Sequence, residues 1–374
     1  MRGYTFLDTT IAVTTGVPAI AQWLDEFLVP AFDRWTGDAA AFVVRVRAEA
    51  AAHEAIAANR PPGALVAAPC FALDREVVRH PSWTASRRTL LADAKYGAFY
   101  VLDGKCVDVV ADPGSRLFRG GAMRVIRELA TARALADPER LQLHAAAFAI
   151  GGRAVLIAGT KGSGKTTLLA YLARTTGASI LGNDRAVVSR HGGDVRVRGV
   201  PTIVSVRPET RALIPCLFDG IAALDRPAHR TLAEADAALA AGETAGTVGR
   251  VRLSPAQLAR QLGVALAAEA GLEAVLFPET DRDPEGLTVD RLTPAESRTR
   301  LLESRFGLQS GKTEPTVFDR LVGGRRPDDA DASAIDALAA TIPCFAVRIG
   351  AGRLRAAAGA EAIVSAVLTP GAGR

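Results

Sequence analysis

Residues 159–166 constrain the fold of this chain more than any other segment. They place Gly159, Gly164, Lys165 and Thr166 at the spacing G-x-x-x-x-G-K-[ST], which is typical of a phosphate-binding loop. The apolar run RAVLIAG leads into the segment and predicts a buried strand. The residues from Lys165 to about Thr175 contain no Gly or Pro and predict a helix. A strand, a glycine-rich loop and a helix in this order predict an α/β fold.

Each residue type in this loop has a physical purpose. Glycines allow backbone conformations that other residues avoid, so that successive N–H groups point at a phosphate, and the start of the helix adds partial positive charge. We expect Lys165 to contact the β and γ phosphates and the Thr166 hydroxyl to bind magnesium. The loop therefore predicts a nucleoside triphosphate, ATP with Mg²⁺, although it does not distinguish ATP from GTP. The expected nucleotide contacts are Gly159, Thr160, Lys161, Gly162, Ser163, Gly164, Lys165, Thr166 and Thr167.

A second segment, GLQSGKT at residues 307–313, has a similar composition. It is one residue shorter than the motif, and it follows a predicted helix instead of a strand. We therefore interpret this segment as an ordinary loop.

The length of 374 residues exceeds one ordinary domain and predicts two. Hydrophobic residues make up 49% of the chain and charged residues 23%, as in globular proteins. We expect residues 1–138 to form an α+β domain for recognition or scaffolding, and residues 139–374 to form the nucleotide-binding domain. The elements expected in the first domain are strands at 4–14, 41–50, 69–74 and 96–112, the last a hairpin turning at Asp103-Gly104, and helices at 18–32 and 121–136.

The second domain is expected to alternate strands and helices. After the two core strands, joined at Gly151-Gly152, and the helix at the phosphate loop, the pattern predicts further elements in order. These are a strand at 179–182, a hairpin around 191–193, a helix at 254–269, a strand at 272–279, a helix at 294–306, an exposed loop at 323–332, and a last strand and helix ending at 368; an acidic, alanine-rich stretch lies near 231–246.

The net charge of +5 does not predict a nucleic-acid partner, because the basic residues, mostly arginine, are scattered along the chain. The strand of four apolar residues ending in Asp that a DNA- or RNA-acting ATPase needs is also missing. The four cysteines show neither CxxC nor zinc spacing, so we expect reduced thiols and a cytoplasmic location. We expect no membrane segment and no export signal, because Thr, Gly and Pro interrupt the uncharged residues 9–24.

The run from His144 through the loop to Asp184 resembles the catalytic core of HPr kinase/phosphorylase and the broader HPr-kinase-related proteins. Those proteins have a histidine on the strand before the loop, the loop itself, and an acidic pair further along. Here His144 and Asp184 occupy the outer positions. The segments TVDRLTPAES at 288–297 and IPCFAVRIG at 342–350 also resemble later parts of these kinases, so the resemblance covers roughly residues 139–368.

The resemblance implies a P-loop kinase core of the HPr kinase/phosphoenolpyruvate carboxykinase type, preceded by the N-terminal α+β domain. It implies phosphoryl transfer to a serine hydroxyl, with Asp184 as the base and a neighbour of the metal. His144 would orient Asp184 or stabilise the developing charge. Two positions depart from the family pattern: Asn183 replaces the first acid of the pair, and Arg196 replaces a glutamate that helps to hold magnesium. Both departures argue against phosphorylase activity and against HPr as the substrate.

Two functions remain open from the sequence. The first is an ATP-dependent kinase for a serine or other hydroxyl of a peptide, protein or small metabolite. The second is a nucleotide-binding regulatory module with little or no phosphotransfer. A purely structural interpretation makes Asp184 a turn residue and His144 a core histidine. The sequence does not choose among Arg198, Arg250 and Arg252 as the arginine that assists transfer, and it leaves open whether the chain forms a homo-oligomer.

Overall fold

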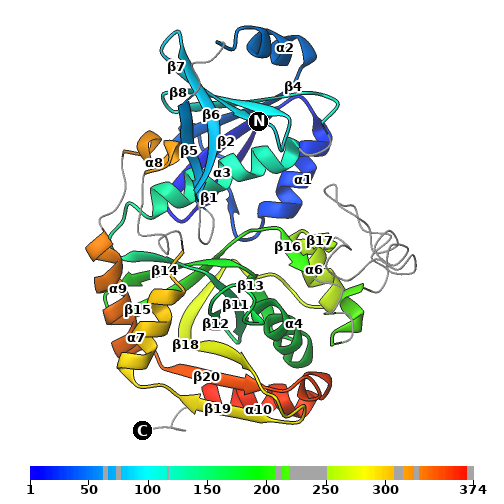
Figure 1. Cartoon of the computed structure of the whole chain (residues 1–374), viewed down its shortest axis with the longest axis vertical. Helices are drawn as coiled ribbons and strands as arrows, with labels where there is room; N and C mark the ends of the chain where they lie inside the picture. Colours follow the sequence, from blue (N-terminus) through cyan, green and yellow to red (C-terminus); the bar gives the residue numbers. More distant parts are fainter. Residues whose placement is uncertain are drawn as a thin grey trace. The chain divides into compact units, whose positions relative to one another are not determined.

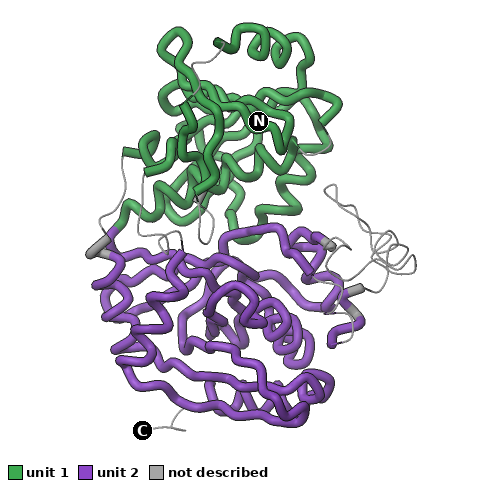
Figure 2. The backbone as a smooth tube through the Cα atoms, viewed as in Figure 1, with its two compact units in different colours: residues 1–137, 307–326 green, residues 138–306, 327–374 purple. Residues whose placement is uncertain are grey.

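The computed structural model describes residues 1–61, 66–72, 77–115, 118–206, 210, 213–218, 251–306, 315–323 and 328–368. The chain divides into two compact units, residues 1–137 with 307–326 and residues 138–306 with 327–374 (Figure 2). Each unit is mixed α/β and contains one large mixed sheet. The second sequence match at 307–313 and the stretch at 231–246 lie outside the described residues. No helix in the described ranges is long and apolar enough to cross a membrane.

The first unit is built on a nine-stranded sheet with the order β3-β1-β2-β4-β9-β8-β7-β6-β5 (Figure 1). The pairs β2–β4 and β4–β9 are parallel and the other neighbours are antiparallel. The sheet is therefore mixed, and β3 and β5 form its two edges. The strands are β1 (Arg2–Phe6), β2 (Thr9–Thr15), β3 (Asp33–Arg34), β4 (Phe42–Ala48), β5 (Val66–Ala72), β6 (Val77–Ala85), β7 (Arg88–Asp93), β8 (Ala98–Asp103) and β9 (Cys106–Ala111).

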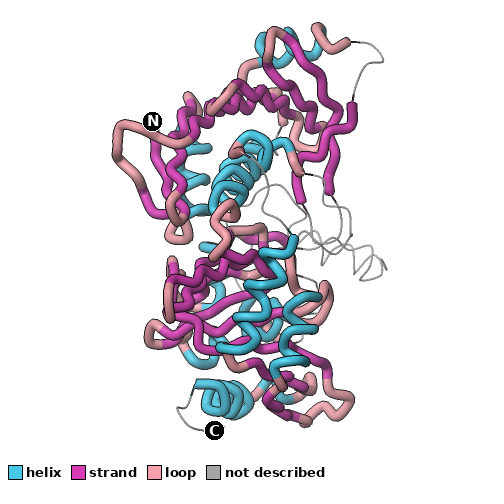
Figure 3. The backbone as a smooth tube through the Cα atoms, turned by 90° about the vertical axis from the view of Figure 1, so that its left-hand side faces the viewer, coloured by secondary structure: helices cyan, strands magenta, loops and turns pink. Residues whose placement is uncertain are grey.

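Helices cover both faces of this sheet. The sheet curves around α3 (Phe118–Ala134), which packs against β1, β2, β4 and β9 together with α1 (Pro18–Leu28) (Figure 3). On the opposite face, Ile56 of α2 (Ala50–Ala58) contacts a buried cluster that includes Trp83 and Phe99. Residues 307–326, which the sequence places in the second domain, group with this unit. Their described helix, α8 (Val317–Leu321), packs against α3 and β5, where Phe318 stacks on Phe71.

Several elements of the first unit differ from the sequence expectation. Residues 4–14 form two antiparallel strands, because Leu7 adopts a φ of 54° and the chain reverses at Leu7-Asp8. The expected hairpin over 96–112 is confirmed, but its two central residues are Gly104 and Lys105. Strands β6 and β7 and helix α2 were not predicted from the sequence. Strands β6 and β7 contain several polar residues on a half-exposed surface, so their alternation is weak.

The second unit contains a nine-stranded sheet with the order β10-β14-β15-β18-β12-β11-β13, and β20 and β19 extend it beside β18. Strand β18 is central: it runs parallel to β12 and β20 and antiparallel to β15. A separate pair is formed by β16 (Val204–Val206) and β17 (Val251–Leu253). The strands are β10 (Arg140–Leu143), β11 (Ala145–Ile150), β12 (Arg153–Ala158), β13 (Ser179–Gly182), β14 (Arg185–His191), β15 (Asp194–Val200), β18 (Glu269–Thr280), β19 (Leu287–Arg291) and β20 (Cys344–Ile349).

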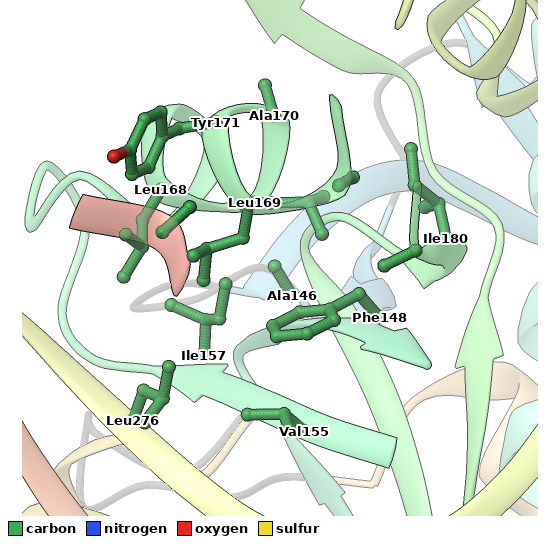
Figure 4. Close-up of a cluster of buried hydrophobic side chains, with 14 of the residues drawn as sticks. Ala146, Phe148, Val155, Ile157, Leu168, Leu169, Ala170, Tyr171, Ile180 and Leu276 are labelled. Atoms are coloured by element: carbon green, nitrogen blue, oxygen red, sulfur yellow. The ribbon is translucent and has the colours of Figure 1, made fainter. Parts of the chain in front are cut away.

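Helices lie on both faces of this sheet and bury alternate residues of each strand. Phe148 of β11 and Ile157 of β12 pack beneath α4 (Lys165–Thr176) (Figure 4). Residues of α6 (Pro255–Leu262) and α10 (Ala357–Leu368) belong to the same buried cluster. Their sequence neighbours Ala147 and Leu156 point to the other face, toward α7 (Pro294–Glu303) and α9 (Asp328–Thr341). Because both faces are covered, β11 and β12 are apolar apart from Arg153 at the start of β12.

Several boundaries in this unit differ from the expectation, among them the end of α7, which lies at Glu303 instead of 306. The helix expected over 254–269 ends at Leu262, because Gly263 adopts a left-handed φ of 68° and caps it. The exposed loop expected over 323–332 is helical from Asp328, where α9 begins. The strand–loop–helix order around residue 159 and the hairpin of β14 and β15 at 191–194 are confirmed.

Candidate functional site

The loop between β12 and α4 has the backbone that its glycines predict. Gly159, Gly162 and Gly164 have φ values of 145°, 92° and 93°. A side chain at any of these positions would be strained, because L-residues rarely adopt such angles. Gly164 precedes the first residue of α4 and makes no side-chain cap. The first N–H groups of the helix are therefore not used by a side chain at that position, as an anion-binding helix start requires.

Lys165 folds back onto the loop that precedes it. Its side chain is buried, and Nζ donates hydrogen bonds to the carbonyl oxygens of Gly159 at 2.7 Å and Thr160 at 2.9 Å. The ammonium group is thus fixed beside the loop backbone. A compact charge held in this way can act on a phosphate placed at this loop.

The loop is close-packed at Gly159 and open to solvent further along. A Cβ atom added to Gly159 would lie 2.8 Å from Oγ of Ser163, which is too close. Lys161, Gly162 and Gly164 are exposed, and Thr166 and Thr167 are half-buried. Below them, Leu168 and Leu169 anchor α4 in the core (Figure 4). The loop is therefore both rigidly supported and accessible from solvent.

His144 and Asp184 lie in contact, as the sequence resemblance implies. Nε2 of His144 lies 3.1 Å from Oδ1 of Asp184. His144 follows β10, and its backbone N–H donates to the carbonyl oxygen of Ser304 at 2.7 Å. Its side chain is 6% exposed, whereas that of Asp184 is 43% exposed. The imidazole is therefore part of the protein interior, and the carboxylate can meet a substrate.

The electrostatic environment keeps Asp184 ionised. Burial alone would raise the pKa of this carboxyl, but its hydrogen bond with His144 and the positive charges of Arg185 and Lys165 outweigh it. Together they lower the pKa of Asp184 to about 2. The contribution of Lys165 links the phosphate loop to this carboxylate.

The neighbour of Asp184 has a structural role. Asn183 is buried, and its Oδ1 accepts a hydrogen bond from Oγ1 of Thr202 at 3.0 Å. The strand end just before it is equally constrained, because a Cβ atom on Gly199 would lie 1.8 Å from the carbonyl oxygen of Leu181. This close backbone approach fixes where the chain turns from β13 into β14. Asp184 is therefore the one acidic side chain that the pair offers to the site.

A buried cation beside Asp184 escaped the sequence analysis. The Arg185 guanidinium lies 3.9 Å from the centre of the Phe306 ring, and Phe306 also makes an edge contact with His144. Arg185 is 4% exposed. The sequence could have indicated Arg185 through its position directly after Asp184. It could not have indicated Phe306, which is distant in sequence.

Of the arginines suggested by the sequence, Arg198 pairs with a glutamate on a neighbouring strand. Nε of Arg198 donates to Oε2 of Glu269 at 3.1 Å, and Arg196 binds the other oxygen of the same carboxylate. Burial raises the pKa of Glu269, but these two partners outweigh it and lower the pKa below its ordinary value. Arg252 lies on β17, and Arg250 is outside the described residues. Arg198 is thus engaged in joining β15 to β18.

The residues fit a magnesium ion that is bound largely through phosphate oxygens. Within the described ranges, no three His, Cys, Asp or Glu side chains are grouped to hold a metal. Magnesium in nucleotide sites needs only one or two protein carboxylates besides phosphates and water. The half-buried Thr166 hydroxyl and the ionised, partly exposed Asp184 meet that requirement. Cys70, Cys106 and Cys344 are free thiols.

Comparisons with known proteins find similarity among solved structures. No family model matches the chain. No curated protein sequence matches it significantly. Among solved structures, it is similar to the Hpr(Ser) kinase/phosphatase from Coxiella burnetii, with 12% sequence identity, coverage of 60% of this chain and 93% of that chain, and a TM-score of 0.24.

Proposed function

We propose that the second unit is an ATP-dependent phosphotransferase that moves the γ-phosphate to a serine or other hydroxyl of a peptide, protein or small metabolite. The observation that carries the proposal is the pairing of β11 with β12. Ala145, next to His144, pairs with Ala158, the last residue before the phosphate loop. The His144–Asp184 pair therefore lies at the strand end where the loop begins. The positive charge of Lys165, held in the phosphate loop, contributes to the low pKa of Asp184, which is paired with His144. A group that holds phosphate and a group that can meet a hydroxyl therefore share one site.

The loop residues 159–167 would bind the triphosphate through backbone N–H groups, the start of α4 and Lys165. Lys165 would exchange its hydrogen bonds to the Gly159 and Thr160 carbonyls for phosphate oxygens. The exchange replaces neutral acceptors with charged ones, which favours binding. Glycine conformations at the loop would stay as they are.

Asp184 would accept the hydrogen bond of the attacking hydroxyl and aim its oxygen at the γ-phosphate. With a pKa of about 2 it is ionised throughout the neutral range, but it is a weak base. Phosphoryl transfer tolerates this, because its loose transition state needs positioning more than early proton removal. His144, almost fully buried, would keep the carboxylate in orientation.

Thr166 and Asp184 would hold Mg²⁺ together with the nucleotide phosphates. The ion supplies positive charge that neutralises the phosphate oxygens during transfer. On the protein side, the Asp184 carboxylate must therefore stay ionised, and its cationic neighbours maintain that state.

A second function, a nucleotide-binding regulatory module with little or no phosphotransfer, is favoured by Asn183. The amide is buried and bonded to Thr202, so it adds neither charge nor a free oxygen near the nucleotide. A site with a single carboxylate can bind the nucleotide and yet transfer slowly. The two functions differ in whether an acceptor becomes labelled.

The experiment uses the full chain with magnesium, γ-labelled ATP, and a panel of serine peptides and small hydroxyl metabolites. We expect label on an acceptor, loss of transfer in Lys165→Ala and in Asp184→Asn, and retained ATP binding in Asp184→Asn. Asp290→Asn is the matched control, because Asp290 is an exposed aspartate paired with Arg348 on β20. ATP binding without any labelled acceptor, together with an unaltered Asp184→Asn variant, would support the regulatory module instead.

A further inference from the structure

A pocket of 490 Å³ lies in the first unit, in the size range of ligand sites. It is formed by the first half of β5, parts of β6, the turn that follows β6, the end of β8, and α8. All these elements belong to one compact unit. The proposed phosphotransfer chemistry uses none of them.

Among the described residues that line this pocket, the charged side chains are all positive. Arg79, Arg87 and Arg320 contribute to it, and no carboxylate does among its described lining residues. Arg87 and Arg320 are both exposed. The pocket is therefore complementary to an anionic ligand.

The same pocket also offers apolar surface at the edge of a sheet. Val66 is 70% exposed and begins β5, the last strand of the nine-stranded sheet. Leu102 and Val317 supply buried apolar walls. At this edge the Ala67 carbonyl already accepts a side-chain hydrogen bond and Pro69 has no N–H, so an extended chain would lie against β5 mainly through its side chains, alternate ones of which enter the adjoining pocket. A small anion would use the arginines but not this strand or its apolar walls.

The backbone at Arg87 is a further observation. Ser86 and Arg87 are the central residues of the β6–β7 turn and have φ values of 49° and 67°. Such turns favour Asn and Gly, because other residues are strained at positive φ. An arginine there is unfavourable for the turn itself. Its presence in the pocket wall is explained if its charge contacts a ligand.

We propose that this pocket binds an extended, acidic segment of the acceptor polypeptide, which lies along the edge of β5. Acidic side chains of the segment meet Arg87 and Arg320, and apolar side chains contact Val66 and the pocket walls. The assignment rests on the proposed function only in taking the acceptor to be a polypeptide. Binding of the peptide itself requires no phosphoryl transfer.

The test is fluorescence anisotropy of the full chain with two labelled peptides centred on serine. In one peptide Val alternates with Asp, and in the other Val alternates with Lys. We expect the acidic peptide to bind at least about tenfold more tightly, with an affinity that falls as salt rises. Equal affinity for both peptides would overturn the proposal. So would full displacement of the acidic peptide by inorganic phosphate or by single-stranded RNA at equal charge concentration.

Two glycine variants separate the charge of Arg87 from the strain of its turn. Ser86→Gly and Arg87→Gly both relieve positive φ, so both are expected to raise the melting temperature. Only Arg87→Gly removes a pocket charge, and we expect it to weaken the acidic peptide by about three- to tenfold. Arg320→Gln should act similarly, whereas Ser86→Gly should bind normally. Normal binding by Arg87→Gly and Arg320→Gln would refute the assignment.

Failure of this proposal is distinguishable from failure of the proposed function. Lys165→Ala should lose transfer and keep wild-type affinity for the acidic peptide, because Lys165 is in the other unit. Peptide binding without transfer to any acceptor would support the pocket and refute the kinase. Transfer to a polypeptide whose affinity is insensitive to Arg87 and Arg320 would refute the pocket alone.

Discussion

At the scale of single residues, Asp184 lies in a positive electrostatic environment. His144 bonds to it, and the charges of Arg185 and Lys165 act on it as well. This arrangement favours a carboxylate that stays ionised when further negative charge, such as a triphosphate, comes near. The same cations favour that phosphate. Asp184 and the phosphate loop thus depend on one shared positive field.

The low pKa of Asp184 makes the stability of the folded chain depend on pH in the acidic range. The pKa is about 2 in the folded chain, against an ordinary value of 3.8. A group with a lowered folded pKa stabilises the fold above its ordinary pKa, and that contribution is lost as the pH falls toward the folded value. We expect the free energy of unfolding of the wild type to exceed that of Asp184→Asn at neutral pH. The difference between the two proteins should become smaller as the pH falls below the ordinary pKa of Asp184. Urea denaturation at a series of pH values measures it, and a constant gap would contradict the assignment.

Arg185 and Arg198 are expected to behave differently when each is changed to Gln. Arg185 acts on Asp184, whereas Arg198 is bonded to Glu269. We expect Arg185→Gln to slow transfer by more than about tenfold and Arg198→Gln by much less. Transfer rates of the two purified variants, corrected for the folded fraction, provide the comparison, and each variant is the control for the other. A larger loss of transfer rate in Arg198→Gln would show that Arg198 on β15 supplies the positive charge that assists transfer.

At the scale of elements, β12 and α4 hold the phosphate loop from both ends. Both are core elements: Leu156 and Ile157 of β12 are fully buried, and so is Leu169 of α4. The loop therefore has little freedom at its ends, and its glycines set the path between them. Precise placement of backbone N–H groups follows from this packing more than from the loop itself.

Removing core volume beneath α4 should loosen the loop. Leu169→Ala deletes a fully buried side chain, which typically costs about 2–5 kcal/mol of unfolding free energy. Arg174→Ala is the control on the same helix, because Arg174 is exposed and its loss is worth less than about 0.5 kcal/mol. Denaturant unfolding gives both values, and nucleotide affinity measured below the unfolding transition shows whether the loop has moved. Equal stability of the two variants would mean that α4 is not held as described.

Sequence reasoning succeeded where the determinants are local. The strand, glycine turn and helix around residue 159 depend on neighbouring residues, so the motif predicts them. The contact between His144 and Asp184 was available only through the family resemblance. Phe306, which contacts both Arg185 and His144, could not be found, because nothing local marks a partner that distant in sequence.

The missed elements have the same cause. Trp83 of β6 is buried only because the neighbouring strands and α2 cover it, and its own segment alternates weakly. The strand predicted over residues 4–14 was too long, because a positive φ at Leu7 is not visible in a run of β-formers. Periodicity thus identifies a core strand that is covered on both faces more readily than a half-exposed edge region.

At the scale of the whole molecule, the chain passes from the first unit to the second, returns to the first for residues 307–326, and then ends in the second. Residues 307–326 carry α8 into the first unit, although residues on both sides of them belong to the second. In α8, Phe318 is fully buried and stacks on Phe71 of β5. The first unit is therefore completed by a segment that the sequence assigned to the other domain, and the proposed peptide pocket uses that same helix.

This connectivity predicts that two buried side chains, one in each unit, affect different unfolding steps. Phe318→Ala removes the α8 anchor and should cost about 3–5 kcal/mol in the first unit, whereas Leu338→Ala in α9 should cost about 2–5 kcal/mol in the second. Hydrogen exchange of the full chain, read separately over residues 77–115 and 139–200, should show faster exchange in the first range for Phe318→Ala and in the second for Leu338→Ala. Nucleotide affinity should remain near wild type in Phe318→Ala, because the phosphate loop is in the other unit. If Phe318→Ala accelerates exchange equally in both ranges, the two units unfold as one, and α8 stabilises the phosphate loop as well as the peptide pocket.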